Sequence, residues 1–262
     1  MGHAMEVLEG RILNSAALTA WTNNTGDTLA IRSFPFDQGN ALLEDAWALS
    51  ATAGTMRIRS PRLHDNVQGI RMGVAASDPR PLLPDWFEQP LYPQDVLIVE
   101  QAGGGAETDC GALFVYYENL PGVNARLFTW DVIQPLMRNL LTVEVSPVSS
   151  GTAGDYGAGR AINADFDLLK ANVDYAVLGY MTPASVLTVG IRSVDFGNLR
   201  VGGPGHVQRD ETRDWFVRQS IFSRRPMIPV FNAANKGNCV VDVVANVTAT
   251  ATVNVIICAQ LS

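Results

Sequence analysis

Histidine is scarce in this sequence, which contains only His3, His64 and His206. None of the three belongs to an HxH or HExxH pattern, and enzymes that hold a metal on inward-facing strands need clustered His and Glu ligands. The same scarcity argues against a His-based catalytic triad. We therefore predict no enzyme, with no catalytic, cofactor-binding or transition-metal residues. His64 and His206 are expected to be solvated loop side chains.

Cysteine is equally rare. Cys110, Cys239 and Cys258 lie in or beside apolar runs and show no CxxC spacing, so neither a disulfide framework nor a zinc site is expected. We predict three buried, reduced thiols. Reduced thiols imply synthesis in a cytoplasm.

Charge is also low. Only 17% of the residues are charged, against about 25% in an ordinary soluble domain, so much of the surface must be small and polar and suited to being covered by neighbours. The net charge of −7 argues against a phosphate-binding groove, because nucleic-acid affinity rests on clustered Lys and Arg. We expect no direct contact with nucleic acid.

Long apolar runs are missing. No stretch approaches the roughly 18 to 20 apolar residues of a membrane span, and no secretory signal opens the sequence. The chain is expected to be soluble or peripheral.

The sequence is rich in short β-branched or alternating segments bounded by Gly, Pro, Asn and Asp, which predict strands. Many short strands at regular spacing favour an all-β sandwich or barrel. The expected strands are 29–34, 46–51, 55–60, 69–74, 95–100, 111–118, 140–145, 161–166, 174–180, 186–193, 199–202, 239–245 and 252–260. Only 129–140 and 209–220 are expected to be helical, both in connections.

The second half of the chain repeats the first. Residues 80–84 (RPLLP) match 225–229 (RPMIP) at an offset of 145. Residues 58–60 (IRS) match 191–193 (IRS) at an offset of 133. Further matches in the same order are 70–73 with 199–202, 113–117 with 254–258, Asp45 with Asp174, Trp86 with Phe231, Val96 with Val241 and Ile98 with Val243. Ordered matches of this kind indicate internal duplication.

Each copy then holds about eight strands, the size of a jelly roll. The fold class is therefore predicted to be all-β, as two tandem jelly-roll β-sandwiches from internal duplication. The join is placed between Asn119 and Gln134. The expected domains are a first jelly roll at 1–119, a connecting segment at 120–139 and a second jelly roll at 140–262.

This tandem pair in an acidic, His-poor chain, with its RPxxP repeat, resembles the double jelly-roll major capsid proteins of tailless icosahedral viruses, especially membrane-containing bacteriophages. The resemblance covers nearly the whole chain. It implies a virion protein, made in the host cytoplasm, that forms homotrimers whose six jelly rolls make a pseudo-hexagonal capsomer. The implied partners are neighbouring capsomers, other virion proteins and an internal membrane.

Two groups of residues leave other chemistry open. Carboxylates at Glu107 and Asp109, or at 210–214 (Asp210, Glu211, Asp214), could hold loosely bound Ca²⁺, although solvated loop charge is favoured. No other cofactor is expected. The glycines at 103–105 and 202–205 lack a P-loop pattern and predict ordinary turns.

Aromatic pairs offer the alternative function. Trp86-Phe87 and Trp215-Phe216 each precede the last strands of their copy, as in a duplicated carbohydrate- or receptor-binding module, whether a virion spike or lectin-like. Core or intersubunit packing is the favoured interpretation. A duplicated jelly-roll hydrolase would need paired carboxylates in one cleft, which the spacing does not indicate. If the chain assembles, we expect the segment 128–141 and the loops of Trp86 and Trp215 to form contacts.

Overall fold

Antiparallel strands are the main secondary structure of the described chain. The computed structural model describes residues 2–13, 16–22, 40–62, 67–84, 87–92, 97–104, 108–120, 124–205 and 212–262. In the first half the strands are β1 (Gly2–Leu13), β2 (Thr19–Ala20), β3 (Asn40–Leu49), β4 (Gly54–Arg59), β5 (Ile70–Val74), β6 (Gln89–Leu91), β7 (Ile98–Ala102) and β8 (Thr108–Leu120).

The second half follows the same plan. Its strands are β9 (Leu127–Phe128), β10 (Met137–Val145), β11 (Arg160–Ala161), β12 (Asp174–Met181), β13 (Val186–Arg192), β14 (Val201–Pro204), β15 (Ile228–Asn232), β16 (Val240–Ala245) and β17 (Asn254–Leu261). Helix α1 (Trp130–Ile133) precedes β10, and α3 (Trp215–Ser223) lies between β14 and β15.

The strand order shows two jelly rolls. Over the described residues, the first half forms sheets ordered β1-β8-β3-β6 and β2-β7-β4-β5. The second forms β10-β17-β12-β15, extended at its edge by β9, and β11-β16-β13-β14. Strand by strand the two orders are the same, and two four-stranded sheets linked in this way make a jelly roll. The predicted fold class, two tandem jelly-roll sandwiches from internal duplication, is confirmed.

Register confirms one of the sequence matches. Arg59 ends β4 opposite Ile98, the first residue of β7, and Arg192 ends β13 opposite Val240, the first residue of β16. Each arginine reaches the third residue of the partner strand. Nη2 of Arg59 lies 3.1 Å from Oε1 of Glu100, and the corresponding distance from Arg192 to Oδ1 of Asp242 is also 3.1 Å.

The serines that follow these arginines repeat as well. Ser60 and Ser193 are both fully buried. Each hydroxyl accepts a bond of 3.2 Å from the backbone N–H two residues later, at Arg62 and Asp195. Such a turn explains why the chain leaves both strands at the same point.

The RPxxP match is wrong. Pro229 lies inside β15, where it pairs with Leu127, whereas Pro84 precedes β6, which begins at Gln89. Leu91 pairs with β3 and Phe231 with β12, at equivalent positions of the two jelly rolls. Gln89 lies two residues before Leu91, and Pro229 lies two residues before Phe231, so Gln89 is the counterpart of Pro229. Proline fits β15 because its position beside the short edge strand β9 does not need every ladder bond.

Other matches are displaced along their strands. Ile70 lies opposite Ile58 and Val201 opposite Ile191, so Val201 rather than Leu199 is the counterpart of Ile70. The match of 113–117 with 254–258 is also displaced by two residues, that of Ile98 with Val243 by three and that of Asp45 with Asp174 by five. Trp86 and Val96 lie outside the described residues.

A β-bulge occurs at the same place in both copies. The register of β3 on β8 shifts between Leu43 and Asp45, and that of β12 on β17 shifts between Val177 and Gly179. The residues at the two shifts are Glu44 and Leu178. A bulge turns a side chain away from its regular direction, and both residues are buried.

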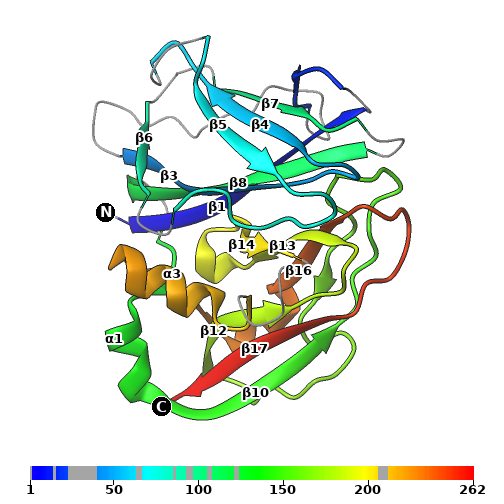
Figure 1. Cartoon of the computed structure of the whole chain (residues 1–262). Helices are drawn as coiled ribbons and strands as arrows, with labels where there is room; N and C mark the ends of the chain where they lie inside the picture. Colours follow the sequence, from blue (N-terminus) through cyan, green and yellow to red (C-terminus); the bar gives the residue numbers. More distant parts are fainter. Residues whose placement is uncertain are drawn as a thin grey trace.

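The four sheets lie in successive layers (Figure 1). The first sheet of the first jelly roll contacts β13 and β14 of the second, so its strand β8 is covered on both sides. Leu113 and Val115 belong to the core of the first sandwich, whereas Phe114 and Tyr116 belong to the core that continues into the second half. Burial on both faces explains why β8 is a continuous apolar run instead of an alternating one.

Most expected elements are found, with three corrections. Of the strand expected over 161–166, only Ala161 lies in a strand, the short β11 (Arg160–Ala161). The strand expected at 29–34 lies outside the described residues. The helix expected over 129–140 ends early, because Pro135 lies in a 3₁₀ turn (Gln134–Leu136) and β10 begins at Met137. The second helix runs three residues further than expected, to Ser223.

Among the described residues, no helix has the length and apolar character needed to cross a membrane.

Candidate functional site

Trp215 holds the two jelly rolls together. It opens α3 of the second jelly roll and is only 3% exposed. Its ring centroid lies 6.2 Å from that of Trp47 and 6.1 Å from that of Phe114, edge-to-face in both cases. Both partners belong to the first jelly roll. Such pairs add to the free energy gained by burying the rings.

A glycine makes room for this tryptophan. Nε1 of Trp215 donates to the carbonyl of Gly202 at 3.0 Å. A Cβ added at Gly203 would lie 2.5 Å from Nε1 of Trp215 and 2.4 Å from the hydroxyl of Tyr180. The glycines at 202–203 were predicted to form a turn, which is wrong: they lie in β14, where the missing side chain allows the close approach.

The alternative sugar-binding role of the aromatic pairs is not supported at 215–216, where the favoured core packing is found. Trp215 and Phe216 are both buried inside the chain, so neither offers a ring face to a ligand or to another subunit. The expectation that Trp215 lies in a loop at a subunit contact is therefore wrong. Phe87 packs on the first core, and Trp86 lies outside the described residues.

A second link between the jelly rolls is the guanidinium of Arg225, which follows α3. It contacts three carboxylates of the first jelly roll: Glu44 at 2.7 Å, Glu88 at 2.9 Å and Glu118 at 3.1 Å. It also lies 5.4 Å from the ring centroid of Tyr116. The guanidinium of Arg225 therefore bridges three carboxylates that come from different parts of the first jelly roll.

Glu44 is the most buried member of this cluster, since its side chain is only 4% exposed. Desolvation raises its pKa from 4.5 to about 7, although Arg225 opposes the shift. The neighbouring Glu88 adds to the increase. The carboxyl therefore gains or loses a proton near neutral pH.

This shift predicts a pH dependence of stability. The pKa of Glu44 is higher in the folded state than in the unfolded state. The contribution of Glu44 to the free energy of unfolding is therefore complete below pH 4.5 and is lost as the pH rises to about 7. We expect Glu44→Gln to remove about 1–3 kcal/mol of this loss. Urea unfolding at pH 4.5, 6 and 8 measures it, with Glu144→Gln on exposed β10 as control. Parallel pH curves for wild type and Glu44→Gln would contradict the prediction.

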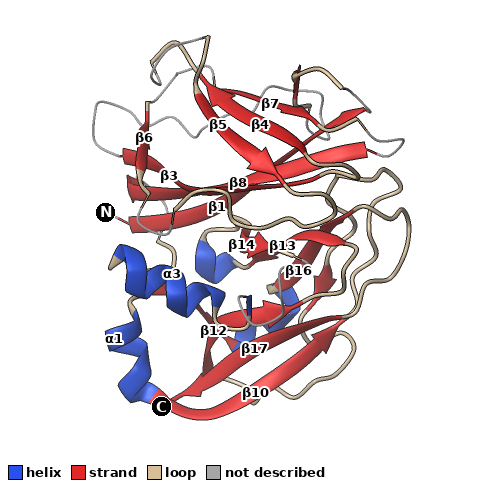
Figure 2. Cartoon of the chain, viewed as in Figure 1, coloured by secondary structure: helices blue, strands red, loops and turns tan. Residues whose placement is uncertain are grey.

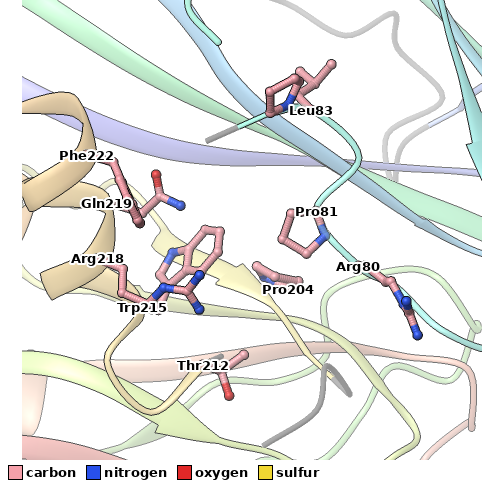
Figure 3. A pocket seen from close by; sticks show the side chains of 10 residues that line it. Arg80, Pro81, Leu83, Pro204, Thr212, Trp215, Arg218, Gln219 and Phe222 are labelled. Carbon is pink, nitrogen blue, oxygen red and sulfur yellow. The ribbon is translucent and has the colours of Figure 1, made fainter. Parts of the chain in front are cut away.

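A cleft of about 340 Å³ opens where the two jelly rolls meet (Figure 3). Arg80, Pro81 and Leu83 line it from the first jelly roll, and Arg218, Gln219 and Phe222 of α3 face them. Asp78 pairs with Arg80. Arg80 and Arg218 carry positive charge at the cleft, the exposed ring of Phe222 lines it, and Trp215 is buried beneath it.

Several exposed apolar side chains lie on helices α1 and α3 and near the start of β10. Helices α1 and α3 lie on the same side of the molecule (Figure 2), and the N–H of Trp130 donates to the hydroxyl of Ser220 at 3.1 Å. The large apolar residues exposed around these helices and the start of β10 are Val132 (43%), Leu136 (38%), Leu140 (63%), Ile221 (50%) and Phe222 (52%). We call these five residues the apolar edge.

The other residues predicted from the sequence are dispersed. His64, His206, Glu107, Asp210 and Glu211 lie outside the described residues. Asp214 is exposed at the start of α3, and His3 stacks on Tyr116 with ring centroids 5.8 Å apart. The three cysteines are free and buried, as predicted. Burial raises the pKa of Cys110 and Cys258 to about 12.

The expectation for Asp109 is wrong. This residue was expected to be solvated, but it is fully buried, since β8 carries it into the first sandwich. Within the described ranges, no group of three or more His, Cys, Asp or Glu side chains could hold a metal ion.

Comparison with known proteins does not assign this chain to a family. No family model and no curated protein matches the sequence. Among solved structures, the PBSX exported protein XepA matches 98% of this chain and 86% of its own at 12% identity, with a TM-score of 0.28. The STIV MCP, a major capsid protein, matches 100% of this chain and 97% of its own at 9% identity, with a TM-score of 0.22. Both TM-scores lie below 0.5, so the fold assignment rests on the strand order within this chain.

Proposed function

We propose that this chain is a structural subunit of a virion shell and assembles as a homotrimer. The jelly rolls at 1–119 and 140–262, joined by the segment 120–139, would then contribute six sandwiches to each pseudo-hexagonal capsomer. Neighbouring capsomers, other virion proteins and an internal membrane are the proposed partners, and the chain itself performs no catalysis.

The observation that carries this proposal is the apolar edge on a doubled sandwich. Leu140 is 63% exposed and Phe222 52%, on elements that are otherwise well packed. Contiguous exposed apolar surface on a soluble protein usually marks an interaction site. Much of it lies in the segment 128–141 that the sequence predicted as a contact.

We assign a second copy of this chain as the occupant. Charges of both signs border the apolar edge: Asp131 on α1, Arg138 on β10 and Arg224 after α3 are all exposed. A surface with both signs can complement a copy of itself, and closed symmetry is the usual solution for such a surface.

The mass of the native assembly tests the proposal. We expect sedimentation and cross-linking to give trimers, or very large particles that electron microscopy shows as closed shells. A monomer that stays soluble at high concentration would contradict it.

Substitution of the apolar edge should separate folding from assembly. We expect Leu140→Ser/Ile221→Ser/Phe222→Ser to dissociate the trimer at least tenfold more readily while the thermal midpoint of the monomer changes little, because these side chains are solvent-exposed in the monomer. Val67→Ser/Leu168→Ser, at two exposed apolar residues outside the helices and strands, is the matched control. An unchanged association constant in the triple variant would place the contact elsewhere.

A further inference from the structure

One end of the first sandwich contains a buried carboxylate with nothing to neutralise it. Asp109, at the start of β8, is 0% exposed, and neither of its carboxylate oxygens has a hydrogen-bond partner among the described residues. Burying an unpaired carboxylate costs several kcal/mol. The buried carboxylate therefore needs a compensating positive charge.

A second oxygen without a partner lies beside it. Ser50, directly after β3, is 1% exposed, and its hydroxyl likewise has no partner in the described part of the chain. Two unsatisfied buried oxygens from different strands are unusual, because buried polar groups are nearly always paired.

Gly103 shows how close these oxygens are. A Cβ built at Gly103 would lie 1.9 Å from Oγ of Ser50 and 2.4 Å from Oδ2 of Asp109. The two oxygens are thus separated by less than the sum of these distances. That span is compatible with two ligands of one Ca²⁺ ion, whose Ca–O distances are about 2.3–2.6 Å.

Further oxygens are held nearby. The hydroxyl of Thr52 donates to the carbonyl of Gly103, which fixes the turn after β3 against the end of β7. Arg11 pairs with Asp155 of the second jelly roll and so is engaged elsewhere. The candidate ligands here are the carboxylate of Asp109, the hydroxyl of Ser50 and the carbonyl of Gly103, which are all hard oxygens.

We propose that Asp109, Ser50 and the carbonyl of Gly103 form a calcium site that neutralises the end of the first sandwich. A single carboxylate with neutral oxygens makes a weak site, in the range of about 0.1–1 mM. This site is independent of the apolar edge and of assembly.

The test compares the purified protein in 5 mM CaCl₂, 5 mM MgCl₂ and EDTA. We expect calcium, but not magnesium, to raise the thermal midpoint by about 3 °C, and Tb³⁺ to give luminescence when tryptophan is excited. Trp21 is suited to sensitise it, because its ring covers Gly111, two residues from Asp109.

Variants test whether these oxygens bind the cation. Asp109→Asn and Ser50→Ala should abolish or weaken the calcium shift and the Tb³⁺ signal, whereas Asp131→Asn, at an exposed Asp on α1, should retain both. If calcium produces no shift, or if Asp109→Asn keeps the Tb³⁺ signal, the site is not a calcium site. A rise in the midpoint of Asp109→Asn without any calcium effect in wild type would show that the carboxylate is buried without a bound cation.

Discussion

Replacing Arg225 by Met should cost about 3–5 kcal/mol of unfolding free energy at pH 8. The substitution leaves Glu44, whose side chain is 4% exposed, without its 2.7 Å partner. The loss reflects a buried charge without compensation more than the lost contact itself. Glu88 and Glu118 remain close, and their repulsion adds to it.

The same variant should recover at low pH. Removing Arg225 takes away the main influence that lowers the pKa of Glu44, so this pKa should rise above the value of about 7 in the wild type. Below pH 5 the carboxyl is protonated in both proteins, and the difference should shrink to less than half. Urea unfolding at pH 5 and pH 8 measures this.

A double variant separates charge from packing. Arg225→Met/Glu44→Gln should regain most of the stability at pH 8, because the buried charge is gone. Arg224→Met, at the exposed neighbouring position, is the control and should change stability by less than about 0.5 kcal/mol. An equal loss in the single and double variants would show that Arg225 acts through packing alone.

The sequence was sufficient to predict a duplicated jelly roll, but not the alignment of the copies. Successive side chains of a strand alternate between faces, so a match displaced by two residues preserves the apolar pattern. This is the error at Ile70, whose counterpart is Val201 and not Leu199. The match of Arg59 with Arg192 is confirmed, since both arginines pair with an acid on the adjacent strand in the same way.

The candidate sites depend on contacts between distant segments. Arg225 meets carboxylates more than a hundred residues earlier in the chain, and no local pattern indicates such a cluster. A signal was nevertheless present: Glu44 and Asp109 interrupt or adjoin strongly apolar strands. A carboxylate at such a position is often buried, and a buried carboxylate needs a partner.

The largest effect on the coupling between the jelly rolls is expected for Trp215→Ala. This change removes a ring that is 3% exposed, its contacts with Trp47 and Phe114, and its bond to Gly202. Removing a buried tryptophan costs about 3–5 kcal/mol.

We expect this loss to fall mainly on the second jelly roll, which carries α3, so that urea unfolding of Trp215→Ala resolves into two transitions. Trp215→Phe keeps part of the buried surface and should retain one transition with a smaller loss. Trp130→Ala is the control, because Trp130 is half-buried against the same core and its backbone N–H donates to Ser220 of α3. It should lower stability without separating the transitions. A single cooperative transition in Trp215→Ala, with the midpoint of wild type, would show that the inner β8 and β13 layers couple the jelly rolls without this side chain.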